Sequence, residues 1–400
     1  MTKLHYNFKD VFRAARFGFS AKKMWVQFLG LLVGVVGYLI LAYIAFLVGT
    51  EHGFLDVWGK FRFIPLPFGV QFGWLGWIFM ALGFIWFVAV NLLTICAVSK
   101  VTFEQLRGDE FYEIKESFKF IRANWKAVLL SPATLALFIV VLVAIGILFG
   151  LIGWIPHFGV LFIGILWIPI FAVSLFVVYL IVIFFVSFIA APAVVGTTKS
   201  DTFDTLFELF SVVNEQNWRW FVYQVLLLFT IGVAGVVLGL FIKYALGLAN
   251  WAIGLAMGDK LVAVLNNAYC YLPSVPKLSF IPRIYSIFFP QLLAQKTPMP
   301  VPWSSDIAAC LIGIFLYLVL FLWHSYGLAI FSAGQSLIYI DLVKKKDDKD
   351  LLEKKDEGEA KVPEKVEAEE KSEEGETEKS SEEEEKKGNN SKGQARKKNA

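Results

Sequence analysis

The sequence predicts an all-α polytopic membrane protein: a helix bundle of about six transmembrane helices, with amphipathic helices at the cytoplasmic interface and a disordered C-terminal tail. Three observations predict this class. Hydrophobic residues make up 57% of the 400 residues, so lipid must be the solvent for most of the chain. Apolar runs long enough to cross a hydrocarbon layer of about 30 Å recur along it. From residue 344 onward the chain is almost entirely charged, small or polar and has no aromatic residue.

Residues 1–24 are predicted to form a basic amphipathic helix. Asp10 is the only acidic residue in this stretch, which is rich in Lys and Arg. The apolar side chains fall near one helical face, at Phe8, Val11, Phe12, Ala15 and Phe19. We expect such a helix to lie in the plane of the membrane surface, with its basic side chains beside anionic headgroups.

Six apolar blocks are predicted to cross the membrane. The link 156–159 between the third and fourth blocks is so short that these two spans should form an antiparallel hairpin. Lys243 interrupts the fifth block and is taken as its end, which leaves residues 243–305, rich in Pro, as an irregular outer region with interfacial or re-entrant helices. The predicted spans are 25–49, 72–98, 127–155, 160–191, 219–242 and 307–340.

Two further amphipathic helices are predicted at the membrane surface, over 101–125 and 201–217, because their apolar residues recur at helical spacing. Three spans begin with an aromatic and basic entry, of the kind that marks a membrane interface. The predicted lipid-interface anchors are Trp25, Trp125, Trp218, Lys23, Lys126 and Arg219.

Basic residues flanking the spans predict the orientation. Lys and Arg are frequent in residues 1–24 and in 99–126, sparse in 50–68, and absent from 156–159. The positive-inside rule therefore places both termini in the cytoplasm, in the inner or plasma membrane of the cell. The glycines Gly30, Gly34 and Gly37 recur along the first span and should permit close helix packing.

Part of the chain resembles a known group of proteins. Ala191-Pro192 ends a predicted span and is followed by an amphipathic helix and by Asn217-Trp218-Arg219. This pattern resembles a loose group of prokaryotic multi-pass proteins related to the membrane domain of some glycerophosphodiester phosphodiesterases. The similarity covers mainly residues 97–135 and 188–230. No catalytic phosphodiesterase portion accompanies it, so the resemblance implies the membrane fold without the enzyme activity.

Residues 344–400 are predicted to be a disordered, charged cytoplasmic tail, because they hold too little apolar surface to fold. Their first basic cluster should rest against anionic headgroups of the membrane lipids. The terminal basic block, 386–398, either contacts a soluble acidic partner or pairs with the acidic middle of the tail. The second interpretation is favoured, and nucleic acid is not an expected partner because aromatic residues are missing.

His324 is the one ionisable side chain near the middle of a predicted span. It is a candidate substrate or proton site, with Ser325, Tyr326 and Gln335 as neighbours on the same helix. The alternative is a neutral imidazole that holds two helices together, and it is favoured because no second acid or base lies at that depth. Cys270 and Cys310 either form an outer disulfide or are unrelated thiols, the second being favoured.

The sequence contains no catalytic or metal-binding motif. We therefore expect a non-enzymatic scaffold or assembly factor, without cofactor or metal, that binds membrane lipids and meets a soluble cytoplasmic protein through its tail. The alternative is a transporter or lipid carrier with a mid-membrane cavity near His324. An intramembrane enzyme would need other polar groups gathered around that histidine. The oligomeric state is left open.

Overall fold

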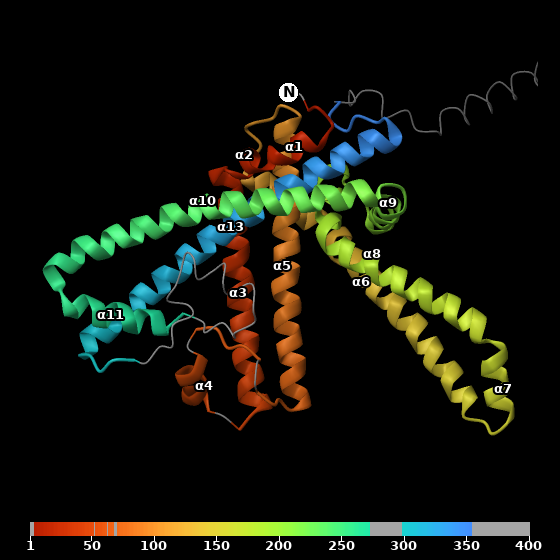
Figure 1. Cartoon of the computed structure of the whole chain (residues 1–400), viewed down its shortest axis with the longest axis horizontal. Coiled ribbons are helices and arrows are strands. Elements are labelled where there is room, and N and C mark those ends of the chain that lie inside the picture. Colours follow the sequence, from red (N-terminus) through yellow and green to blue (C-terminus); the bar gives the residue numbers. More distant parts are fainter. Residues whose placement is uncertain (1–3, 52, 62, 68–69, 273–297, 354–400) are drawn as a thin grey trace, which may run out of the picture. The chain divides into compact units, whose positions relative to one another are not determined.

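The computed structural model describes residues 4–51, 53–61, 63–67, 70–272 and 298–353. Contacts divide the chain into two units, Met1–Leu352 and Glu353–Ala400, and all described helices belong to the first. Within the described residues every regular element is an α-helix (Figure 1), which confirms the predicted all-α class.

Six of the described helices are long and apolar enough to cross a membrane, which confirms the polytopic architecture. Their apolar side chains point in nearly all directions, as expected for helices whose solvent is lipid. The protein is therefore a multi-pass membrane protein. The six helices are α3 (Ala21–Gly49), α5 (Trp74–Leu106), α6 (Ile114–Gly153), α8 (Trp167–Thr198), α10 (Asn217–Met257) and α13 (Trp303–Asp347).

Shorter helices connect or flank the long ones. They are α1 (Phe8–Phe12), α2 (Ala14–Gly18), α4 (Phe54–Phe61), α7 (Phe158–Ile165), α9 (Thr202–Glu215) and α11 (Asp259–Cys270). The helix predicted over 201–217 corresponds to α9. The single helix predicted over 1–24 is wrong, because the chain leaves helical geometry at Phe19 and Ser20. α1 and α2 are separate short helices, and α3 begins at Ala21.

The predicted helix over 101–125 is also wrong, since α5 continues to Leu106 and α6 begins at Ile114. Gly108 ends α5 with φ of 98°, a conformation that glycine adopts without strain. Two backbone hydrogen bonds, from Gly108 to Gln105 and from Asp109 to Glu104, close the helix end in a Schellman motif. Glu113 then starts α6 with a capping box.

The fifth span does not end near residue 242. α10 runs through Lys243, whose long side chain is compatible with a helix in lipid because it can extend to a polar surface. With 41 residues, α10 is about 60 Å long, roughly twice the hydrocarbon thickness. Gly258, with φ of 54°, turns the chain into α11, which packs on α13. Of the predicted irregular region 243–305, residues 273–297 lie outside the described residues.

Two other boundaries shift. α8 continues past Pro192 to Thr198, so the fourth span is not finished at residue 191. α13 reaches Asp347, so the first residues of the predicted tail are helical and extend the sixth span beyond residue 340. The rest of the tail, residues 354–400, lies outside the described residues.

Many buried residues of α3, α5, α8 and α13 lie in one region, which we call the hub. Here α5 and α13 contact each other and both contact α3 and α8, and α1 and α2 pack against α13. The hub comprises Lys23–Gly34 of α3, Leu92–Leu106 of α5, Leu180–Thr197 of α8 and Ser325–Val343 of α13.

The hairpin of α6, α7 and α8 differs sharply from the hub. α6 and α8 run side by side and are joined through α7 (Figure 1). α6 has no buried residue beyond Leu135, and α8 has none before Leu180. We call residues 136–179 the arm. Within it only Gly159 is buried.

Candidate functional site

His324 lies on α13 and is partly buried. Its Nδ1 is 2.7 Å from the carbonyl oxygen of Leu320 on the same helix, and its ring lies edge-on to Trp323 with the centroids 5.3 Å apart. Trp323 donates from its indole nitrogen to the carbonyl oxygen of Gly235 on α10, at 2.8 Å. Trp323, beside the predicted histidine, therefore connects the two helices.

The other three predicted site residues have separate partners. Ser325 donates to the carbonyl oxygen of Leu322 at 2.7 Å. Gln335 and Gln224 form a reciprocal amide pair between α13 and α10, with hydrogen bonds of 3.0 and 2.6 Å. Tyr326 packs edge-on against Phe19, with the ring centroids 5.7 Å apart. Within the described residues no group of three or more His, Cys, Asp or Glu side chains could hold a metal ion.

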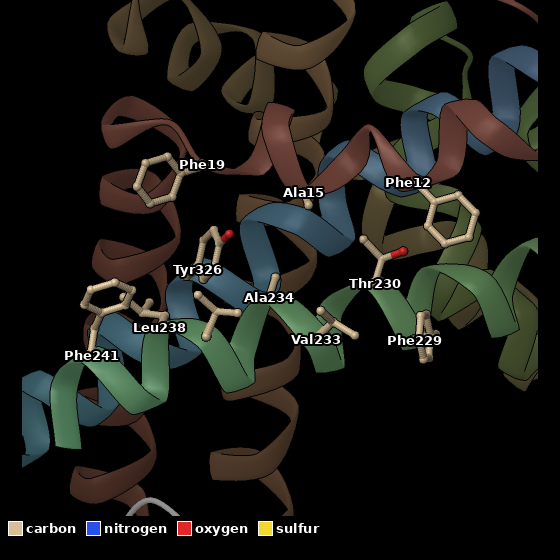
Figure 2. A pocket seen from close by; sticks show the side chains of 11 residues that line it. Phe12, Ala15, Phe19, Phe229, Thr230, Val233, Ala234, Leu238, Phe241 and Tyr326 are labelled. Carbon is tan, nitrogen blue, oxygen red and sulfur yellow. The ribbon is translucent and has the colours of Figure 1, made fainter. Parts of the chain in front are cut away.

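Tyr326 lies in an apolar groove of about 610 Å³ between α1, α2, α10 and α13. Figure 2 shows Phe12 and Phe229 near one end of it, Phe19 and Phe241 near the other, and Tyr326 between them. The polar side-chain groups of the lining are the hydroxyls of Tyr326 and Thr230. Thr230 donates to the carbonyl oxygen of Leu226 at 2.8 Å. Such a lining accommodates hydrocarbon and offers little to an ion.

A polar seam runs through the hub where α3, α5 and α13 meet. Gln27 donates to the hydroxyl of Ser332 at 2.9 Å, and the hydroxyls of Ser99 and Ser336 donate to carbonyl oxygens of the opposite helix. The close packing predicted for Gly30 is confirmed, because a Cβ there would lie 2.5 Å from Thr94 Cγ2. These hydrogen bonds link the helices from inside. The sequence feature that could have indicated this polar seam is the recurrence of small and hydroxyl-bearing residues in α5 and α13.

The predicted lipid-interface anchors behave in two ways. The side chains of Trp25, Trp125, Trp218, Lys126 and Arg219 are exposed, so they are available to lipid, and their anchoring role stays a prediction. Lys23 differs, because only 1% of it is exposed. Its ammonium donates to Gln105 Oε1 on α5 at 2.8 Å. Burial within the hub removes the Lys23 side chain from the exposed surface.

A second pocket, which is polar and has a volume of about 270 Å³, lies beside Lys23. The sequence analysis did not predict this pocket. It is formed by the start of α3, the end of α5 and the loop that joins α5 to α6. Tyr112 in this loop lines the pocket. Burial first, and then the carboxylates of Glu104, Glu116 and Asp109, raise the pKa of Tyr112 to about 12. Its phenol therefore stays protonated at neutral pH and can donate a hydrogen bond.

Cys96, Cys270 and Cys310 form no disulfide. Cys270 donates to the carbonyl oxygen of Asn266 at 3.3 Å, so the interpretation as unrelated thiols agrees with the structure. Comparison with protein-family models, curated proteins and solved structures finds no match to the chain. The resemblance to the membrane domain of glycerophosphodiester phosphodiesterases therefore stays a prediction.

Proposed function

We propose that the protein is a non-enzymatic scaffold or assembly factor of the inner or plasma membrane, with both termini and the hub on the cytoplasmic side. The hub holds its own helices together, and the arm presents apolar surface within the bilayer to the helices of other membrane proteins. The charged tail meets a soluble cytoplasmic partner.

The observation that carries this proposal is the contrast between the hub and the arm. In the most apolar stretch of α6 only 6% of the residues are buried, against 28% in the corresponding stretches of α3, α5 and α13. The two helices of the arm leave nearly all their surface uncovered. Apart from their contact with each other, they make few stabilising packing contacts with the rest of the protein. They are suited to receive a further helix.

The arm also carries a pattern typical of helix association. Gly146 and Gly150 are four residues apart on α6, and a Cβ at either would meet nothing within 4 Å. Glycines at this spacing let two helix backbones approach closely in a membrane. In the described structure this surface of α6 is open, so a partner helix could pack there without displacing any side chain.

The test is site-specific crosslinking in native membranes, from a photoreactive group placed at Val143, an exposed residue of α6 that lies on the same helix face as the two glycines. We expect a discrete crosslinked product that is lost in Gly146→Leu/Gly150→Leu. The control, Gly232→Leu, alters a glycine of α10 that is equally open and should keep the product. If the arm crosslinks to lipid alone, or if the product survives in the double variant, the scaffold proposal fails.

The groove at Tyr326 favours a second candidate, a lipid carrier. A volume of about 610 Å³ is within the range of ligand pockets, roughly 300 to 1,000 Å³, and the lining suits an acyl chain. Lipid transfer between proteoliposomes tests it. Transfer that Ala234→Trp abolishes by filling the groove would support the carrier and contradict the scaffold. His324→Ala is the companion variant, and flux that depends on this histidine would likewise contradict the scaffold.

A further inference from the structure

Among the described residues, Lys23 is a buried lysine without a carboxylate partner. It is among the largest side chains of the described chain that are almost completely buried, yet its ammonium contacts one neutral acceptor, Gln105 Oε1. The Phe17 ring lies 5.5 Å away and adds a weak cation–π attraction. Among the described residues no carboxylate lies within 4.0 Å of the ammonium. Burial disfavours the charged form of a lysine, and an anion beside it would stabilise that form.

Lys23 is one of the residues that line the polar pocket of about 270 Å³. Four consecutive residues at the start of α3, from Ser20 to Lys23, form one wall. Ser20 is the N-cap residue of α3, but its hydroxyl makes no capping hydrogen bond. The first backbone N–H groups of a helix carry partial positive charge and favour an anion. The wall thus combines a helix start with the two ammonium groups of Lys22 and Lys23.

Two acidic residues also line the pocket. Asp109 and Glu110, from the loop after α5, line the pocket and are exposed, whereas Lys23 is buried. Lys23 therefore lies beneath the protein surface, and the two acidic residues are open to solvent. When both lysines are charged, the charges of Lys22, Lys23, Asp109 and Glu110 sum to zero, so a simple anion would be attracted by the lysines and repelled by the carboxylates. A molecule with an anionic group at one end and an ammonium at the other fits both.

We propose that this pocket binds a small zwitterion of the phosphoethanolamine type, with its phosphate at Lys23 and its primary ammonium at Asp109 and Glu110. Phosphate oxygens can accept from both lysines and from the hydroxyls of Ser20 and Tyr112, which line the same pocket. A primary ammonium has three donors for the two carboxylates. The same chemistry occurs in free phosphoethanolamine and in the headgroup of phosphatidylethanolamine. The proposal does not depend on the scaffold role.

The test measures binding to the full-length protein in a detergent free of phosphate. Calorimetric titrations with phosphoethanolamine, inorganic phosphate and ethanolamine give the affinity for the whole zwitterion and for each half. Reconstitution in vesicles of phosphatidylcholine, with and without phosphatidylethanolamine, tests the lipid headgroup through the thermal unfolding midpoint. A response to soluble phosphoethanolamine identifies a free metabolite. A response to the lipid alone identifies a headgroup. Either response supports the site.

Lys23→Met should weaken phosphoethanolamine binding by about tenfold or more, because a charge-assisted hydrogen bond in a buried place is lost. Lys9→Met is the matched control: Lys9 is exposed on α1 and does not line the pocket. The double variant Asp109→Asn/Glu110→Gln should weaken the binding of phosphoethanolamine but not the binding of inorganic phosphate.

Unchanged phosphoethanolamine affinity in Lys23→Met would overturn the proposal. If Lys23→Met does not fold, the double variant Asp109→Asn/Glu110→Gln is used instead, because both residues are exposed. A phosphoethanolamine affinity equal to that of the unaltered protein in this double variant would overturn the proposal. A protein that responds neither to the soluble probes at about millimolar concentration nor to phosphatidylethanolamine would overturn it too.

Discussion

The amide pair between Gln224 and Gln335 offers a measurable contribution to helix association inside the membrane. Gln335 is 2% exposed, and the pair forms two hydrogen bonds between α10 and α13, of 3.0 and 2.6 Å. Hydrogen bonds between helices in membranes contribute about 0.6 kcal/mol on average, and up to about 1.7. Two such bonds should therefore give a coupling free energy of about 1.2 kcal/mol.

A double-mutant cycle with Gln224→Leu, Gln335→Leu and the double variant measures this coupling in the free energy of unfolding in mixed micelles. Each single variant should be destabilised, and the double variant should lose less than the sum. The control cycle pairs Gln335→Leu with Ser174→Ala on the arm, whose hydroxyl donates to its own helix at Ile170, at 2.9 Å. That cycle should be additive within about 0.5 kcal/mol. A coupling of zero between the two glutamines would refute the reasoning.

Two further changes test how the short helices dock. Gly18→Val should lower the free energy of unfolding by about 1 to 3 kcal/mol, because a Cβ there would lie 2.6 Å from Ile330 Cα. Gly247→Val is the control, because a Cβ at Gly247 would meet nothing within 4 Å. Equal destabilisation by the two variants would contradict the close packing of Gly18 on Ile330. Lys346→Met should raise hydrogen exchange in α9, since it removes the bond to Ser211 Oγ at 2.8 Å. Lys344→Met, which loses a contact to Asp348 near its own helix end, should leave α9 protected.

The sequence predicted the long helices well because their signal is composition over many residues. An apolar block of about 20 residues can satisfy its backbone in lipid only as a helix, so six blocks gave six spans. Their ends were predicted less well. A charged residue such as Lys243 was taken as the end of a span, although lysine is a good helix former and can extend to a polar surface.

The break in the 101–125 segment was visible in principle. Leu106-Arg107-Gly108 carries the glycine signal of a helix end, and Glu113 with Glu116 forms a capping box. The apolar periodicity runs from Phe111 to Trp125 and outweighed these signals, although the positions three and four residues after Leu106 are Asp109 and Glu110. Local capping chemistry therefore determined the boundary, and apolar periodicity alone did not reveal it.

The candidate site depends on contacts between distant parts of the chain, which spacing cannot reveal. His324 stood out because it is a titratable residue in an apolar run, yet the helix contact beside it is made by Trp323. Lys23 was interpreted from its position beside Trp25 as an interface residue. Its burial follows from the way α3 packs on the end of α5, where Gln105 accepts its hydrogen bond.

The central claim is that the helices cross a bilayer with the hub side in the cytoplasm and the end of the arm outside. Labelling of single cysteines with a membrane-impermeant maleimide tests it, in a chain with Cys270 and Cys310 replaced by Ser. His157→Cys, between α6 and α7, should be labelled in intact cells, and Glu110→Cys, in the loop after α5, only after permeabilisation. Labelling of Glu110→Cys in intact cells would contradict the account.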